Sequence, residues 1–271
     1  MTRRKVESIL IAATAVFVGG TQLVPGADKP GPVTRAAAAV VTGNITPSAT
    51  VATALGVAKP KSTAALELNN ALATLAPQVR KLSRPEALED AFKSYFAYKN
   101  EHPDDVKRPF LYFVDYGLAP TEARGYVFDM SSLKIVDGPF TVAQGRGSST
   151  DKYGIPTKFG NASGSARTSL GLYVTKALYP FTGHTGGSRY SSIGMRLMGV
   201  SKGFNDLAYA RGVVAHGAPY VTATKAGRSE GCPAMEPARA QRLLPMLADG
   251  SMVFLFAPDA NWLANDPWVN S

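Results

Sequence analysis

Cysteine and histidine are scarce in this 271-residue sequence, which has one cysteine, Cys232, and three histidines. A single cysteine excludes an intramolecular disulfide, so the hydrophobic core must hold the fold together. Zinc accepts a thiolate and two imidazoles as ligands, here Cys232, His184 and His216, but no short ligand spacing connects His184 to the other two. We therefore expect no metal and no other cofactor, and keep metal-assisted hydrolysis as an alternative.

Long apolar runs are also missing at the start of the chain, where a membrane anchor is commonly found. Arg3-Arg4-Lys5 is followed by an apolar run over 9–18, shorter than the roughly 20 residues of a transmembrane helix. A cationic start, a short apolar run and small residues after it are typical of a secretory signal. We expect residues 1–27 to be a signal peptide, or an uncleaved anchor that is the protein's one contact with a membrane. The protein is then exported to the periplasm or cell envelope.

The next part of the chain changes from linker-like to helical composition. Residues 28–61 are rich in Ala, Pro, Thr, Val and Gly and have no sustained hydrophobic period, which is typical of a flexible linker. Helical spacing of apolar residues follows within a segment spanning 62–107. It predicts one helix over 62–76 and a second that begins at Ser83, because an N-cap residue there is followed by Glu86 three positions later.

Residues 108–258 consist mainly of short apolar or alternating runs, separated by turns rich in Gly, Asp, Ser and Pro. Such runs at this spacing are typical of a β-sandwich or a partly closed barrel. We predict a mainly β domain here, preceded by the short helical segment and followed by an irregular C-terminal tail over 259–271. The predicted strands are 110–116, 125–130, 134–136, 140–144, 170–175, 195–199, 212–216 and 252–257.

Cys232 and His216 lie in one stretch of the sequence, 212–234. The β-branched run before His216 predicts a buried strand, and a Gly-rich loop leads from its end to Cys232. A helix is predicted to begin at Pro237, shortly after the cysteine. Unsatisfied N–H groups at a helix start and a nearby imidazole both favour a thiolate over a thiol. The pattern predicts Cys232 as a nucleophile and His216 as its base.

The same stretch carries a resemblance to a known family. A strand that ends in His216-Gly217, followed by Gly227-Arg228-Ser229-Glu230-Gly231-Cys232-Pro233-Ala234, resembles the L,D-transpeptidase (YkuD-type) family and especially its murein L,D-transpeptidase catalytic domain branch. Segments 169–174, 195–199 and 203–206 are similar to this branch too, so the resemblance extends over 108–258. In the wider family a second histidine usually precedes Gly-Cys and an Arg or Asn follows it, whereas here Glu230 and Pro233-Ala234 occupy those places.

The resemblance implies a β-sandwich with its site in a cleft, and acyl transfer through a cysteine thioester. Cys232 would attack a meso-diaminopimelate carbonyl in a peptidoglycan stem peptide, D-alanine would leave with a proton from His216, and a second stem peptide would supply the acceptor amine. It also implies that carbapenems acylate Cys232. The expected catalytic residues are Cys232, His216, Gly231 and Ser229, and the expected substrate-binding residues are Arg228, His184, Gly217 and Tyr220.

Each of these residues has an expected task. The backbone N–H groups of Gly231 and Cys232 are expected to stabilise the tetrahedral oxyanion. Ser229 is expected to fix either the imidazole or the loop, and the Arg228 guanidinium is suited to a substrate carboxylate.

Basic residues outnumber acidic ones in the whole chain, which has a formal net charge of +9. Most of this excess lies around the predicted site, since residues 140–235 contain eleven Lys or Arg and three Asp or Glu. Such a field attracts nucleic acid, anionic lipid or acidic polymers. Export and the absence of a nucleic-acid motif favour stem peptides, with their free carboxylates, and exclude nucleic acid as the expected partner.

Two further alternatives stay open from the sequence. Water as the acceptor would make the same site an L,D-carboxypeptidase, because both reactions share the thioester. A non-catalytic peptidoglycan-binding module would use the basic cleft alone, but has no need of the Cys232 and His216 pair.

Overall fold

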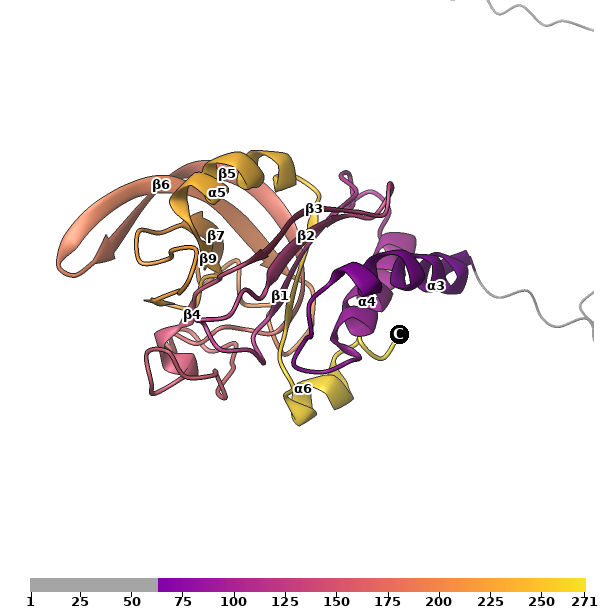
Figure 1. Cartoon of the computed structure of the whole chain (residues 1–271), viewed down its shortest axis with the longest axis horizontal. Coiled ribbons are helices and arrows are strands. Elements are labelled where there is room, and N and C mark those ends of the chain that lie inside the picture. Colours follow the sequence, from indigo (N-terminus) through magenta and orange to yellow (C-terminus); the bar gives the residue numbers. More distant parts are fainter. Residues whose placement is uncertain (1–62) are drawn as a thin grey trace, which may run out of the picture. The chain divides into compact units, whose positions relative to one another are not determined.

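The computed structural model describes residues 63–271, so the predicted signal peptide (1–27) and linker (28–61) lie outside the described residues. Eight strands form one mixed sheet: β1 (Phe110–Asp115), β2 (Gly125–Asp129), β3 (Lys134–Phe140), β5 (Gly171–Thr185), β6 (Ser188–Gly199), β7 (Val214–Gly217), β9 (Ala234–Met235) and β10 (Met252–Phe256). Their order in the sheet is β3-β2-β1-β10-β5-β6-β7-β9 (Figure 1). The prediction of a mainly β fold preceded by a short helical segment is confirmed.

A second, two-stranded sheet lies beside the large one. It pairs β4 (Gln144–Gly145) in parallel with β8 (Arg228–Ser229). The predicted separate strands over 134–136 and 140–144 are wrong in detail, because β3 runs continuously to Phe140 with shifts in its register against β2.

The core lies where the centre of the sheet meets the helices. β10 is buried along its whole length and pairs in parallel with β1 and antiparallel with β5. Its sequence Met-Val-Phe-Leu-Phe has no polar residue, as expected for a strand with both faces covered. Helix α4 (Ala87–Glu101) packs against β1, β10 and β5, and α5 (Pro237–Leu247) packs against β5, β6 and β7. The start predicted for the latter helix, Pro237, is confirmed.

The helical segment is joined to the sheet by side-chain contacts. Helix α3 (Thr63–Leu75) and a 3-10 turn (Ala76–Gln78) precede α4, in agreement with the first predicted helix. The start predicted for the second helix is wrong, since α4 begins at Ala87. The backbone N–H and the hydroxyl of Ser83 instead donate to the Asp115 carboxylate, at 2.7 and 2.6 Å, and this interaction ties the segment to the end of β1.

The first half of the C-terminal tail is helical, where an irregular tail was expected. Helix α6 (Ala260–Asn265) begins after Asp259, whose carboxylate accepts the Trp262 N–H at 2.9 Å as an N-cap. The Trp262 ring is buried against Phe254 and Phe256 of β10, with ring centroids 5.7 Å apart in both pairs. Within residues 63–271, no helix has the length and apolar character needed to cross a bilayer.

The hairpin of β5 and β6 is much longer than the short strands predicted at 170–175 and 195–199. Its turn is Gly186-Gly187, where both residues have positive φ, 55° and 80°, a conformation that glycine adopts without strain. Figure 1 shows the two strands continuing beyond the sheet as a long, curved arm near β7 and β9. This arm brings residues of the 180s to the stretch that contains His216 and Cys232.

Candidate active site

Cys232 and His216 lie in the wall of the same cavity, which has a volume of about 310 Å³. Four strands (β5, β6, β7 and β8), the segment after β7 and the loop before β9 supply its wall. It contains six of the eight predicted site residues, all except Gly231 and Gly217. The lining residues are Phe181, Thr182, Gly183, His184, Tyr190, His216, Tyr220, Arg228, Ser229, Glu230 and Cys232.

The imidazole of His216 is held by strand pairing, one hydrogen bond and aromatic stacking. β7 lies between β6 and β9, and the residue is 2% exposed. The ring atom Nδ1 lies 3.1 Å from the Gly217 carbonyl oxygen, which can only accept, so Nδ1 carries the proton of the neutral ring. Nε2 is then the basic nitrogen. Phe181 stacks on the ring with centroids 4.3 Å apart and planes at 30°.

Burial decides the charge of this histidine. It lowers the pKa of His216 to about 4, with a smaller opposite effect from the hydrogen bond to Gly217. The imidazole is therefore neutral near pH 7 and able to accept a proton.

The thiol of Cys232 is closely surrounded by protein, although the residue keeps some exposure. Burial raises the pKa of Cys232 above its ordinary value, and the Glu230 carboxylate raises it further. A hydrogen bond from the Val214 backbone and the positive charge of Arg211 act in the opposite direction. These influences leave a protonated thiol and a neutral imidazole in the wall of the same cavity, where the sequence suggested a resting thiolate, because burial disfavours both charged forms.

Ser229 fixes the loop that carries the thiol. Its hydroxyl donates to the Cys232 carbonyl oxygen at 2.6 Å and accepts the Gly231 N–H at 3.1 Å. Of the two roles considered for Ser229, these contacts correspond to the loop and not to the imidazole. The Gly231 N–H is already bonded, whereas the Cys232 N–H has no acceptor within residues 63–271 and is free to stabilise an oxyanion.

Gly231 is required by the shape of this loop. Its φ is +121°, and a Cβ at this position would lie 2.8 Å from the Arg167 carbonyl oxygen. Only glycine fits there without a shift of the backbone.

Arg228 and Glu230 connect the loop to the segment after β4. The Nη1 atom of Arg228 donates to the carbonyl oxygens of Ser149 and Thr150, at 3.2 and 3.3 Å, which leaves the other N–H groups of Arg228 for a substrate carboxylate. Glu230 pairs with Arg146 at 2.7 Å, and both side chains are exposed to water. The residue that stands where the wider family has a histidine is thus engaged in an ion pair at the surface.

His184 and Tyr220 are brought to the cavity by different elements. His184 lies near the end of β5, opposite Arg189 of β6, and reaches the cavity because the hairpin is long. Tyr220 follows β7 and packs edge-on against Tyr190, with ring centroids 6.3 Å apart.

Gly217, expected to contact substrate, does not line the cavity. It is buried, and a Cβ there would lie 2.8 to 3.0 Å from Ser192, Ala240 and Pro237. Its structural role is to allow α5 and β6 to pack closely against β7.

Sequence reasoning missed several residues of this site, of which three have evident roles. Phe181 and Tyr190 enclose the imidazole from the hairpin, and the Gly186-Gly187 turn was the signal that could have located them. The third is Arg211, for which no local motif gives a signal.

Arg211 lies beside the loop that carries Cys232. Its Nη1 donates to the Ser169 hydroxyl (2.6 Å) and the Gly160 carbonyl (3.2 Å), and its Nη2 donates to the Arg167 carbonyl (3.1 Å). Nη2 would also lie 3.6 Å from a Cβ on Gly231. The guanidinium is therefore fixed beside Gly231, and its charge favours the thiolate of Cys232.

No group of three or more His, Cys, Asp or Glu side chains among residues 63–271 is arranged to hold a metal ion. The cavity does contain His184, His216 and Cys232, the three residues of the zinc alternative, but they do not form such a group.

One family model matches more than half of the chain. The sequence model of the L,D-transpeptidase catalytic domain matches residues 80–256. An L,D-transpeptidase structure from Mycobacterium smegmatis is 15% identical with a TM-score of 0.33, over 55% of this chain and 59% of that chain. One from Stackebrandtia nassauensis is 15% identical with a TM-score of 0.33, and the match covers 70% of this chain and 75% of that chain. An L,D-transpeptidase in complex with imipenem is 12% identical with a TM-score of 0.33, and the match covers 55% of this chain and 59% of that chain.

The chain spans less than two thirds of the length of the first of these structures. Among curated proteins, no sequence matches it.

Proposed function

The chain belongs to the L,D-transpeptidase catalytic domain family, and from that premise we propose that it is a peptidoglycan L,D-transpeptidase acting through a Cys232 thioester. The observation that supports this proposal is the shared cavity of Cys232 and His216. A thiol and a neutral imidazole in one enclosed space have the chemistry of a nucleophile and its base.

The first half of the reaction forms the thioester. His216 Nε2 takes the thiol proton as the sulfur attacks the carbonyl carbon of the stem peptide's diaminopimelate residue. Because burial disfavours a resting thiolate, the proton moves during the attack and not before it. The Cys232 N–H donates to the oxyanion, a type of contribution worth about 3 kcal/mol in other enzymes. The carbon–nitrogen bond then breaks, and D-alanine leaves with the proton from the imidazolium.

The second half transfers the acyl group. An amine of a neighbouring stem peptide gives a proton to His216 and attacks the thioester carbonyl, and the thiol is regenerated as the new amide forms. Water as the acceptor gives a carboxypeptidase product from the same intermediate. The N–H groups of Arg228 in the cavity wall and the excess of Lys and Arg over residues 140–235 suit the carboxylates of the stem peptide.

The location of the reaction follows from its substrate. Peptidoglycan lies outside the cytoplasmic membrane, and the secretory pattern of residues 1–27 is consistent with export. We therefore place the proposed activity in the periplasm or cell envelope.

The decisive experiment uses a purified disaccharide tetrapeptide as both donor and acceptor. Mass spectrometry should show release of D-alanine together with a cross-linked dimer, whereas a trimmed disaccharide tripeptide without dimer would indicate the carboxypeptidase. Cys232→Ala should release no D-alanine while keeping the wild-type circular dichroism spectrum. Release at the wild-type rate by Cys232→Ala would exclude the thioester mechanism.

A further inference from the structure

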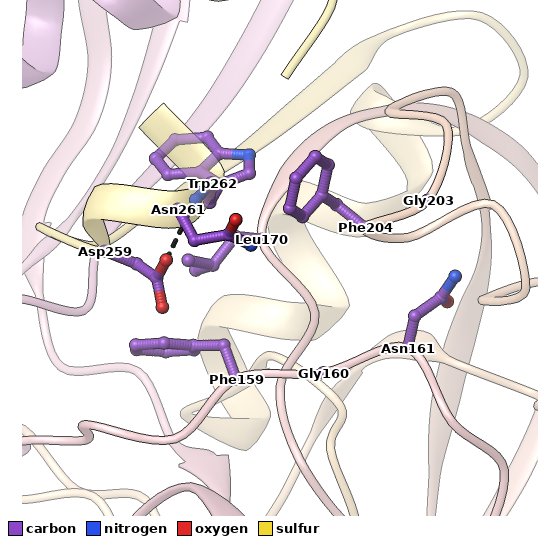
Figure 2. A pocket seen from close by; sticks show the side chains of 9 residues that line it. All are labelled: Phe159, Gly160, Asn161, Leu170, Gly203, Phe204, Asp259, Asn261 and Trp262. Atoms are coloured by element: carbon purple, nitrogen blue, oxygen red, sulfur yellow. Dashed lines mark hydrogen bonds between the residues drawn. The ribbon is translucent and has the colours of Figure 1, made fainter. Parts of the chain in front are cut away.

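A second cavity, of about 210 Å³, lies outside the catalytic one (Figure 2). Three parts of the chain form its wall: the segment that leads to β5, the loop after β6, and the start of α6. The lining residues are Phe159, Gly160, Asn161, Leu170, Gly203, Phe204, Asp259, Asn261 and Trp262.

Three aromatic side chains line this cavity. Phe159 and Phe204 are half-buried, and Figure 2 shows them on different sides of the hollow, with the buried Trp262 ring behind. The rings of Phe159 and Phe204 therefore offer apolar surface to a ligand without being closed off inside the core.

Polar groups complete the wall at fixed positions. Asp259 uses one carboxylate oxygen to accept the Trp262 N–H, and its second oxygen has no partner within residues 63–271. The Asn161 amide is oriented by two bonds, a donation to Asp206 at 2.6 Å and an acceptance from the Leu207 N–H at 3.2 Å. Asn261 is exposed at the rim. Each amide keeps hydrogen-bonding capacity for a ligand.

This lining selects a class of ligand. Aromatic faces suit the C–H surface of a pyranose ring, and carboxylate and amide groups suit its hydroxyl and acetamido groups. No Lys or Arg lines the cavity, and Asp259 repels anions. The volume is below the roughly 300 Å³ of cavities for drug-sized ligands, which suits one ring.

We propose that this cavity binds one neutral N-acetylhexosamine ring of the glycan strand whose stem peptide enters the catalytic cavity. The proposal rests on the proposed function, since it takes peptidoglycan as the substrate.

One side chain connects the wall of the second cavity to the loop that carries Cys232. The Gly160 carbonyl in the wall of the second cavity accepts from Arg211 Nη1, and Nη2 of the same guanidinium lies beside Gly231, next to Cys232. Three extended peptide residues reach about 10 Å, which is the length available to a stem peptide between a bound sugar and the thiol. A sugar held in the second cavity would thus reduce the freedom with which its peptide searches for the thiol.

The first test measures sugar binding without any peptide. The purified full-length protein is titrated with the N-acetylglucosamine tetramer by calorimetry. Phe159→Leu and Phe204→Leu keep an apolar side chain but remove the ring, so each should weaken binding about threefold to tenfold. Tyr153→Leu, a matched change of an exposed aromatic residue outside both cavities, should bind as the wild type does. Unchanged binding in both Phe variants, or no binding by the wild type at millimolar sugar, overturns the proposal.

The second test separates this site from the proposed function. KM for D-alanine release is measured on the disaccharide tetrapeptide and on the free tetrapeptide. For the wild type we expect a lower KM with the disaccharide tetrapeptide than with the free tetrapeptide. In Phe204→Leu the ratio of these two KM values should be near one. Unfolding temperatures check that this variant is folded. Release with equal KM values in the wild type overturns the sugar site and leaves the proposed function standing. Sugar binding lost in the Phe variants, without any D-alanine release by the wild type, supports the site and contradicts the transpeptidase.

Discussion

The imidazole of His216 lies against the ring of Phe181, with centroids 4.3 Å apart and planes inclined by 30°. The two residues are far apart in the sequence and meet because β5 extends beyond the sheet as a long hairpin arm. The aromatic cover keeps water from the imidazole, and burial is the main cause of its low pKa. Phe181 and Tyr190 are two of the rings that bury the imidazole.

Phe181→Ala should raise the pKa of His216 from about 4 toward the ordinary value of about 6.5, because water reaches the ring. The imidazole C–H resonances followed by NMR against pH provide the measurement. Leu178→Ala, at an exposed position of the same strand, should leave the His216 titration unchanged. A titration in Phe181→Ala that matches the wild type would show that this ring does not set the pKa.

The same low pKa predicts how stability depends on pH. Between about pH 6.5 and pH 4 the unfolded state binds a proton at His216 that the folded state does not, so this residue destabilises the fold as the pH falls through that window. Its contribution is absent above pH 6.5. Denaturant unfolding at pH 7 and pH 5 should show a larger loss on acidification for the wild type than for His216→Gln, which has no group that titrates there.

Replacement of His216 by alanine should slow the chemical step by a factor of about 10² to 10⁴, because neither the thiol nor the departing amine then has a proton partner. Binding to purified sacculi should change little, since the basic field comes mainly from the eleven Lys and Arg of residues 140–235. Single-turnover D-alanine release and sedimentation with sacculi measure the two quantities. His102→Ala, outside the cavity, is the matched control. Equal single-turnover rates for His216→Ala and the wild type would remove His216 from the mechanism.

The sequence predicted the parts of this site that are local. The strand before His216, the loop to Cys232 and the helix from Pro237 lie within a few dozen residues, and each has its own pattern of apolar residues, glycines or proline. The mainly β fold was predictable for the same reason, since each strand has its own apolar run.

The features that the sequence could not predict depend on tertiary contacts between distant segments. The distal halves of β5 and β6 lie beyond the sheet and contain exposed residues, so their hydrophobic pattern is weak and only the Gly186-Gly187 turn marks the hairpin. Arg211 reaches the nucleophile loop through contacts that no spacing encodes. The local pattern also suggested a thiolate, whereas burial by distant segments raises the pKa of Cys232.

Ser229→Ala should disturb the nucleophile loop and lower kcat more than it raises KM. The substitution removes the bond to the Cys232 carbonyl and leaves the buried Gly231 N–H without its acceptor, which should cost about 1 to 3 kcal/mol of stability. Urea unfolding and steady-state kinetics measure these effects. Ser191→Ala removes an exposed hydroxyl on β6 and should alter neither quantity. A fully active Ser229→Ala would show that the loop keeps its shape without these bonds.

A carbapenem should acylate Cys232, because a strained lactam carbonyl offers the same attack as the proposed peptide substrate. Intact-protein mass spectrometry after incubation with imipenem should show one adduct, and none in Cys232→Ala. The raised pKa of the thiol predicts that the adduct forms faster at pH 9 than at pH 7. Loss of D-alanine release without any mass change would indicate non-covalent inhibition instead.

Two charged neighbours should shift the reactivity of Cys232 in opposite directions. Glu230→Gln removes a negative charge that raises the pKa of the thiol, and Arg211→Gln removes a positive charge that lowers it. Below its pKa a thiol has a thiolate fraction that grows tenfold for each unit by which the pKa falls. At pH 7 the alkylation of Cys232 by iodoacetamide should therefore be faster in Glu230→Gln and slower in Arg211→Gln than in the wild type.

Salt should distinguish these two effects, because the two side chains differ in exposure. Glu230 is open to water and paired with Arg146, so its influence should be largely screened at 1 M salt, where the Debye length is about 3 Å. Arg211 is half-buried and fixed by three acceptors, so its effect should persist. Alkylation rates of both variants at low and high salt, with the exposed Glu122→Gln as control, provide the test. The electrostatic assignment requires the alkylation rate to change in opposite directions in Glu230→Gln and Arg211→Gln. A change in the same direction in both variants would contradict it and would indicate a change in the shape of the loop instead.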